Sequence, residues 1–171
     1  MGEAKEVIEQ AKIENARVGY QVAVSLRIHE GELFWDQFNA LLVANSIFLA
    51  TIGLAMSTSS PLRVFSLGMP IAGIILCMLW FLLTKRRFAY YRYYTLSARE
   101  IEEKFLSDSV QTISRGGDFA DGKEIKLTIG GTLKPLQLRV LDRLALEWWT
   151  CLIISIFFMI YVAIFIVNIV N

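Results

Sequence analysis

Three long segments without a charged side chain place the strongest constraint on this chain. Residues 38–56, 64–84 and 148–170 contain no Asp, Glu, Lys, Arg or His. An α-helix rises about 1.5 Å per residue, so about 20 residues cross the ~30 Å hydrocarbon layer of a bilayer. A small soluble domain would not bury three charge-free helices of this length. The sequence therefore predicts an all-α membrane protein with three transmembrane helices.

The composition agrees with a membrane protein and argues against two other classes. Of the 171 residues, 55% are hydrophobic and 19% are charged, whereas an ordinary soluble domain is about 45–50% apolar. The net charge of +1 does not suit a nucleic-acid-binding protein, which needs a concentrated basic surface. We therefore expect the lipid bilayer as a partner and no nucleic acid, and the residues identify no small-molecule substrate.

The distribution of basic residues predicts the orientation of the chain. Arg63 is the only one of the 17 Lys and Arg residues that lies in the 57–63 connection between the first two spans. Because short cytoplasmic segments are enriched in Lys and Arg, the N-terminus and residues 85–147 are predicted to be cytoplasmic and the C-terminus to lie on the outer face.

This orientation divides the chain into four regions. They are a cytoplasmic amphipathic helix at 1–37, a transmembrane hairpin at 38–84, a cytoplasmic helix with a small strand and loop region at 85–147, and a third transmembrane helix at 148–171.

Small residues recur at helical spacing on both helices of the predicted hairpin. They are Ser46, Ala50, Gly53 and Ser57 on the first span, and Ser66, Pro70, Gly73 and Cys77 on the second. Small side chains let helix backbones approach closely, which matters in lipid because burial of apolar area does not drive helices together there. We expect the two stripes to face each other, with Gly53 and Gly73 at close contacts. The third span has no such stripe and is expected to be lipid-facing or peripheral.

The predicted cytoplasmic regions contain two helices that lead into or out of the spans. Residues 3–29 form a helix in which one face carries Ile8, Ala11, Asn15, Val18 and Val22. Asn15 on that face either fixes the register of an assembly or is simply solvated. Residues 85–106 are expected to continue the second span as a helix.

The remaining cytoplasmic region carries signals for turns and one strand. Gly116-Gly117, Gly122 and Gly130-Gly131 are expected in turns. Residues 123–129 alternate between polar and apolar, as in a half-exposed strand. Pro135 is expected to precede a final helix from Leu136 to Leu146.

Motifs for catalysis or metal binding are incomplete. Residues 117–124 have the spacing of a phosphate-binding loop, but Glu124 replaces the Ser or Thr that would bind magnesium. His29 is the only histidine, and Cys77 and Cys151 lie within spans as packing residues. We therefore expect no enzyme activity, no cofactor and no metal site.

Polar residues on the first span and the N-terminal helix are the candidate contact residues. Asn45 is the deepest amide in a span, and it needs a partner from its own bundle, a neighbouring subunit or pore water. Because three helices make a thin bundle, we expect Asn45, Ser46 and Asn15 at an oligomer contact or a pore.

Part of the chain resembles a known family. The residues that carry the resemblance are Phe34-Trp35-Asp36-Gln37-Phe38-Asn39, Ala44-Asn45-Ser46, Trp80, Arg87, Tyr91, Tyr94 and Ala98-Arg99-Glu100-Ile101-Glu102. Over residues 30–106 the layout resembles the RipA-like class of small octameric bacterial inner-membrane proteins. The resemblance implies a ring-like homo-oligomer in the bacterial inner membrane, with cytoplasmic domains and no well-defined biochemical activity. A weaker resemblance is to two-span pore-forming effectors of bacterial conflict systems.

Together these features predict a homo-oligomeric multipass protein of the inner membrane with a structural or scaffold-like role. The first alternative is an oligomeric channel or pore-forming membrane effector. The second is a small accessory or anchor subunit of a larger membrane complex. An ion-coupled pump is not expected, because the three spans contain no ionisable Asp, Glu, Lys, Arg or His.

Overall fold

The computed structural model describes residues 2–57, 63–106, 110–138 and 146–170, and the chain divides into two compact units. Residues 32–88 and 146–171 make up one unit, which we call the apolar unit. Residues 1–31 and 89–145 make up the other, which we call the polar unit.

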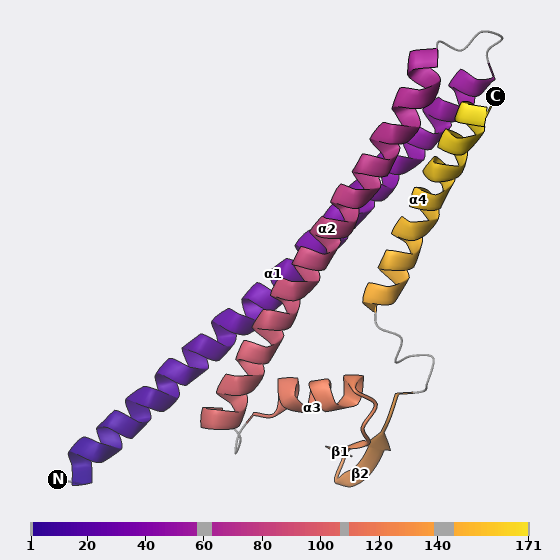
Figure 1. Cartoon of the computed structure of the whole chain (residues 1–171). Coiled ribbons are helices and arrows are strands. Elements are labelled where there is room, and N and C mark those ends of the chain that lie inside the picture. The colour runs from indigo at the N-terminus through magenta and orange to yellow at the C-terminus, as the bar shows by residue number, and fades with distance from the viewer. Residues whose placement is uncertain (1, 58–62, 107–109, 139–145, 171) are drawn as a thin grey trace. The chain divides into compact units, whose positions relative to one another are not determined.

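Two long helices contribute residues to both units (Figure 1). Helix α1 spans Gly2–Met56 and contains no proline, so nothing in its sequence interrupts the backbone hydrogen bonds. Helix α2 spans Arg63–Ile101 and ends in a π-helical turn, Glu102–Leu106. The two predicted cytoplasmic helices are therefore continuous with the first two spans, as expected for residues 85–106.

The apolar unit consists of the C-terminal part of α1, the N-terminal part of α2 and α4 (Leu146–Val170), which lie side by side in Figure 1. The rings of Phe34 and Phe88 are 4.7 Å apart, and those of Phe38 and Trp80 are 5.1 Å apart. Partners thus advance on α1 as they recede on α2, so the two helices are antiparallel. Phe157 of α4 adds a further contact, with its ring 6.0 Å from that of Trp80.

Helix α4 contributes more to this core than its sequence indicated. Ile154 is 3% exposed and Tyr161 is fully buried, so the expectation of a purely lipid-facing or peripheral helix was wrong for this face. Leu152, Ile156 and Met159 are exposed, as a surface toward lipid requires. All three helices are long and apolar enough to cross a membrane, which confirms the predicted fold class.

The small-residue stripes do not face each other. Ser46, Ala50 and Gly53 are exposed on α1, while Gly73 and Cys77 are buried on α2. The side chain that packs on Gly73 is Tyr161 of α4, since a Cβ at position 73 would lie 2.4 Å from its Cε1. The predicted close contact is thus confirmed at Gly73 and wrong at Gly53, where no described atom lies within 4 Å of the Cβ position.

In the polar unit, the short helix α3 (Thr112–Ala120) packs against the two long helices. Its buried Ile113 shares a small core with Ala23 of α1 and Ala98 of α2. Gly116 and Gly117 lie inside α3, so the expectation of a turn there was wrong. Their helical conformation is set by the packing of the helix, which outweighs the weak helix propensity of glycine.

A two-stranded antiparallel hairpin completes the polar unit. Strand β1 (Ile125–Ile129) confirms the predicted strand, and it pairs with β2 (Thr132–Leu136). Gly130 and Gly131 have φ of 59° and 78°, the positive values that a two-residue hairpin turn requires. Leu136 therefore ends a strand and does not begin a helix, and residues 139–145 of that expected helix lie outside the described residues.

Candidate functional site

A buried polar cluster lies at the centre of the apolar unit. Asn45 is fully buried, and its Nδ2 donates to the Leu41 carbonyl oxygen at 2.8 Å. The Tyr161 hydroxyl lies 3.2 Å from both the carbonyl oxygen and Oδ1 of Asn45. The Cys77 thiol donates to the same Oδ1 at 3.6 Å. All three long helices thus meet at one amide.

The three helices surround Asn45, because Tyr161 is long enough to reach across from α4. Asn45 therefore finds its partners within its own chain, and a place at an oligomer contact or a pore stays a prediction. Sequence reasoning missed Tyr161. The available signal was a tyrosine in the middle of a span, since tyrosine normally lies at the membrane interface and a buried hydroxyl needs a partner.

Ser46 lies on a different face of α1 from Asn45. Its side chain is exposed, and its hydroxyl donates to the Leu42 carbonyl oxygen of its own helix at 2.8 Å. Ala50, Gly53 and Ser57 are exposed on the same face. We call these four residues the small face of α1. Its placement allows another helix to approach closely from outside the chain, and the contact role of Ser46 stays a prediction.

A second buried polar cluster joins α1, α2 and α3 in the polar unit. The Glu102 carboxylate is fully buried and accepts hydrogen bonds from the backbone N–H groups of Ile113 and Ser114 at 3.0 and 2.6 Å. The Tyr20 hydroxyl donates to the same carboxylate at 3.1 Å. The free N–H groups of the first turn of α3 are thus satisfied by a side chain from another helix.

The charge of Glu102 is held by these hydrogen bonds. Burial alone would raise the pKa of Glu102, but the bonds from Ser114, Ile113 and Tyr20 outweigh it and lower this pKa below the ordinary value. Glu102 was not among the predicted site residues, because its partners lie 11, 12 and 82 positions away and no periodic pattern connects them.

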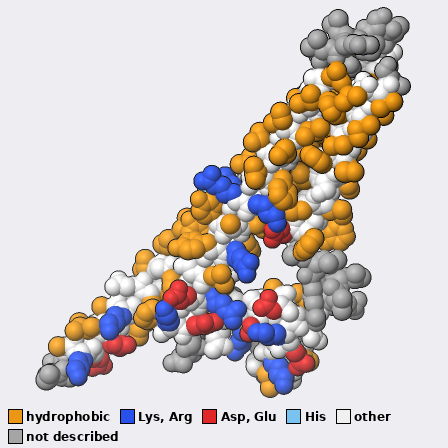
Figure 2. Space-filling model, viewed as in Figure 1, with side chains coloured by type: hydrophobic (Ala, Val, Ile, Leu, Met, Phe, Trp, Pro, Cys, Tyr) orange, Lys and Arg blue, Asp and Glu red, His pale blue; other side chains and the backbone are white. Residues whose placement is uncertain are grey.

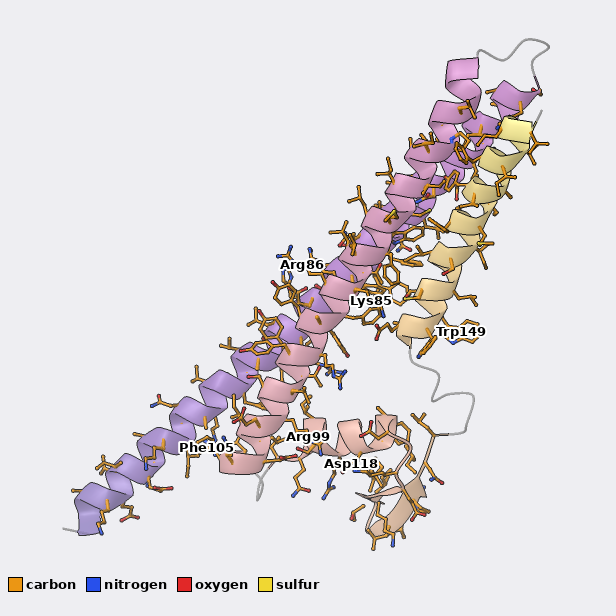
Figure 3. The ribbon with its side chains drawn as sticks, viewed as in Figure 1. Lys85, Arg86, Arg99, Phe105, Asp118 and Trp149 are labelled. Atoms are coloured by element: carbon orange, nitrogen blue, oxygen red, sulfur yellow. The ribbon has the colours of Figure 1, made fainter. Side chains whose placement is uncertain are left out.

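The loop that resembled a phosphate-binding motif is occupied by internal ion pairs. Lys123 donates to Asp118 at 2.8 Å. Arg99 lies 3.5 Å from the same carboxylate, and both Arg99 and Asp118 are labelled in Figure 3. The hydrogen bond from Lys123 lowers the pKa of Asp118. Lys123 and Asp118 neutralise each other and Gly117 is helical, so this segment does not form a cradle of backbone amides for a phosphate.

Helix α1 carries two apolar faces within the polar unit. Ala16 and Ala23 are buried, at 8% and 6% exposed, and Ala23 packs with Ala98 of α2 and Ile113 of α3. On the other face Ile8, Val18 and Val22 are 56%, 53% and 52% exposed. With exposed Ala11 and Asn15 they form what we call the outer face of α1. Hydrophobic side chains are visible along this part of α1 among charged ones in Figure 2.

Asn15 marks the edge of this face. It is exposed and lines a cavity of about 370 Å³ together with Gly19, Ile101 and Phe105. No described residue forms a hydrogen bond with its side chain, and its role in an oligomer contact stays a prediction. Within the described part of the chain, no group of three or more His, Cys, Asp or Glu residues is placed to hold a metal ion.

Three apolar helices around a shared buried amide, with a charged unit formed by the extensions of two of them, define a helical membrane protein (Figure 2). The chain belongs to the octameric membrane protein family (8xMP), whose sequence model matches residues 19–170. No curated protein and no solved structure matches the chain significantly.

The family match confirms the resemblance to an octameric membrane family that residues 30–106 indicated. It extends through the third span and includes nearly all of the apolar unit. The protein is therefore an oligomeric membrane protein.

Proposed function

We propose that this protein is a homo-oligomeric scaffold of the bacterial inner membrane without catalytic activity, and that its copies associate through the outer face and the small face of α1. The copy number is eight, as the name of the family indicates. The three apolar helices cross the membrane, with the N-terminus and the polar unit in the cytoplasm and the C-terminus on the outer face.

The outer face of α1 is the observation that carries this proposal. Exposed Ile8, Val18 and Val22 follow one another at helical spacing, whereas the face that packs inside the chain uses Ala16 and Ala23. A continuous apolar face is unfavourable in water and is typical of a protein–protein contact. Because the family is octameric, we take the partner on this face to be a second copy of the chain.

The small face of α1 supports the same contact inside the membrane. Ser46, Ala50 and Gly53 are exposed, so a neighbouring helix can approach the α1 backbone there more closely than on the faces with large residues. The outer face would then join copies in water and the small face would join them in lipid.

The absence of catalysis is supported by the use of the buried polar groups. Glu102 accepts hydrogen bonds from α3 and Tyr20, and Asn45 bonds to Tyr161 and Cys77. Each of these two groups has partners within the chain that account for its burial.

Charged substitutions on the outer face test the proposal. Ile8→Asp with Val22→Asp places two carboxylates in the contact, where burial of an unpaired charge costs several kcal/mol. Native mass spectrometry of the detergent-solubilised protein is expected to show smaller species for this double variant and an oligomer for the unmodified protein.

A matched control keeps the added charge and changes only its position. Gln10→Asp with Gln21→Asp adds the same two charges to exposed positions of α1 outside both faces, and it is expected to retain the oligomer. A monomer for the unmodified protein, or an intact oligomer for Ile8→Asp with Val22→Asp, would contradict the proposed contact.

A channel is the second candidate, favoured by exposed polar side chains on the first span. Asn39 and Ser46 lie about two turns apart on one face of α1 and are both exposed, so a ring of copies with these residues facing inward would line a polar path. Ion flux through liposomes that contain the oligomer separates the two functions. A scaffold leaves the flux at the level of empty liposomes.

A further inference from the structure

We infer that a groove between α2 and α4 of the apolar unit binds one phospholipid with a zwitterionic, primary-ammonium head group. The acyl chain lies along the apolar part of the groove, the phosphate is bound by Lys85, and the ammonium is bound by Glu147. This site is additional to the scaffold role, and it requires that the apolar unit lie in a bilayer.

The groove is built from two adjoining cavities. The apolar one has a volume of about 390 Å³ and is lined by apolar and small side chains, among them Cys77, Met78, Leu82, Ile154, Ser155 and Phe158. The other, of about 380 Å³, is lined by Lys85, Glu147, Trp148 and Cys151. Phe81 lines both, so the two cavities adjoin at this side chain.

The dimensions of the groove fit one leaflet of a membrane. From Cys77 to Lys85 the groove follows α2 for about 12 Å at 1.5 Å per residue, and half of the hydrocarbon layer is about 15 Å thick. Met78 and Leu82 are 57% and 61% exposed, so the groove is open along its side. In a bilayer, the material that reaches such an opening is an acyl chain.

The charged end of the groove lies at the first turn of α4. Figure 3 shows Lys85 pointing from α2 toward α4, whereas Arg86 points to the other side of α2. Lys85 Nζ is 2.5 Å from Glu147 Oε1. Trp148 and Trp149 in the same turn are exposed aromatic residues of the kind that marks the head-group level.

The charges at this end select the head group. The Lys85 and Glu147 side chains are 47% and 40% exposed, so each keeps hydrogen-bonding capacity beyond the bond that joins them. One cation and one anion side by side complement a ligand that carries one phosphate and one ammonium. An anionic lipid without an ammonium group has no N–H donor for the Glu147 carboxylate. A choline head group carries a positive charge, but its nitrogen has no N–H to donate to this carboxylate.

A helix from a second copy is a poorer occupant of the same groove. It would remove Lys85 and Glu147 from water, and the cost of desolvating an ion pair can exceed the energy of the pair. A lipid head group leaves both side chains in the hydrated interface. The groove therefore favours a lipid over a protein contact.

Native mass spectrometry of the oligomer measures the bound lipid directly. The oligomer is mixed with phosphatidylethanolamine, phosphatidylcholine or phosphatidylglycerol of identical acyl chains, and phosphatidylethanolamine is expected to bind most tightly. Glu147→Gln is expected to weaken phosphatidylethanolamine about two- to fivefold and to abolish its advantage over phosphatidylcholine. Lys85→Gln is expected to weaken all three lipids, because each has a phosphate.

Two further variants separate the groove from general charge effects. Glu124→Gln and Lys126→Gln remove the same charges from the polar unit and are expected to leave lipid binding unchanged. Ser155→Trp fills the apolar part and is expected to weaken all three lipids without altering their order. Thermal unfolding in detergent identifies any variant that fails to fold. The variants that do fold then show whether the groove and its charges bind the lipid.

Several outcomes would overturn the lipid site. Equal binding of phosphatidylethanolamine and phosphatidylcholine, or tighter binding of phosphatidylglycerol, would remove the head-group selection. Equally tight binding of phosphoethanolamine without acyl chains would show that the apolar groove does not contribute to lipid binding. Loss of the oligomer in Lys85→Gln would make the groove a contact between copies. The copy number is read from the same spectra, so a failure of the scaffold proposal is seen separately from a failure of lipid binding.

Discussion

At the scale of single residues, Gly73 leaves room for the ring of Tyr161 in the apolar unit. A Cβ at position 73 would lie 2.4 to 2.7 Å from three atoms of the tyrosine ring. The ring cannot move away without stretching the hydrogen bonds from its hydroxyl to Asn45. Glycine at this position thus allows α4 to reach the buried amide.

Replacement of this glycine is expected to destabilise the apolar unit. Gly73→Ala forces the ring or the helix to shift, with an expected loss of about 1–3 kcal/mol in the free energy of unfolding, the range for overpacked cores. Thermal unfolding in detergent measures the effect. The double variant with Tyr161→Leu is expected to lose less than the sum of the single variants, because the two side chains are in contact.

Gly68→Ala is the matched control for this prediction, because residue 68 is exposed on α2 and lies outside both proposed contact faces. No described atom lies within 4 Å of the Cβ position at residue 68, so the methyl group is expected to be accommodated with little change in melting temperature. Equal melting temperatures for Gly68→Ala and Gly73→Ala would contradict the contact.

These residues also show where prediction from sequence ends. The stripe of small residues on α2 correctly indicated a close approach at Gly73, because only small residues permit one. The partner could not be predicted, since the packing of a ring from α4 depends on the rotation of three helices about their axes. The same rotation turned Asn45 inward and Ser46 outward, although the two are adjacent in sequence.

At the scale of elements, the position of α3 depends on a carboxylate from the end of α2. Glu102 accepts the hydrogen bonds of Ile113 and Ser114 at the start of α3, and its negative charge is favourable at a helix N-terminus. The pKa of Glu102 is below its ordinary value in the folded protein, so its charged form stabilises the fold.

Acidification is therefore expected to loosen α3. The stabilisation from Glu102 is complete above the ordinary carboxyl pKa of about 4.3. It decreases as the pH falls below that value and through the lower pKa of the folded state. Hydrogen exchange between about pH 7 and about pH 3 should show a falling protection factor at the Ile113 and Ser114 amides, whose N–H groups the carboxylate accepts.

Glu102→Gln separates this effect from general acid unfolding. The amide side chain has no charge to lose, so protection at Ile113 and Ser114 is expected to start lower and to depend less on pH. Glu103→Gln changes an exposed neighbour and should retain the behaviour of the unmodified protein. An identical pH profile for Glu102→Gln would contradict the role of its charge.

Elements that are long or have a regular hydrophobic pattern could be predicted from the sequence. Elements that depend on contacts with distant parts of the chain could not. The two long helices and β1 follow from hydrophobic patterns in their own residues. Strand β2 contains Pro135, which disfavours a strand in the middle of a sheet, but both strands of a two-stranded sheet are edges and tolerate proline. Helix α3 contains two glycines and depends on its packing and on Glu102, which no local pattern records.

At the scale of the whole molecule, the predicted orientation is open to a direct measurement. In a Cys151→Ser background, Ser57→Cys and Lys134→Cys introduce exposed thiols at the end of α1 and in β2. Because Arg63 is the only basic residue between the first two spans, Ser57→Cys is expected to react with an impermeant thiol reagent in intact cells. Lys134→Cys should react only after the membrane is permeabilised, and the opposite pattern would reverse the orientation.

The hydrogen bonds of Asn45 have a consequence for the synthesis of the chain. Tyr161 follows Asn45 by 116 positions, so at about 5–20 residues per second the ribosome needs roughly 6–23 s to produce it after the amide. During that interval the nascent hairpin carries a polar group in its centre without its tyrosine partner. The Leu41 carbonyl oxygen and the Cys77 thiol are its partners within the hairpin, so the bonds from Tyr161 are added only when α4 is made.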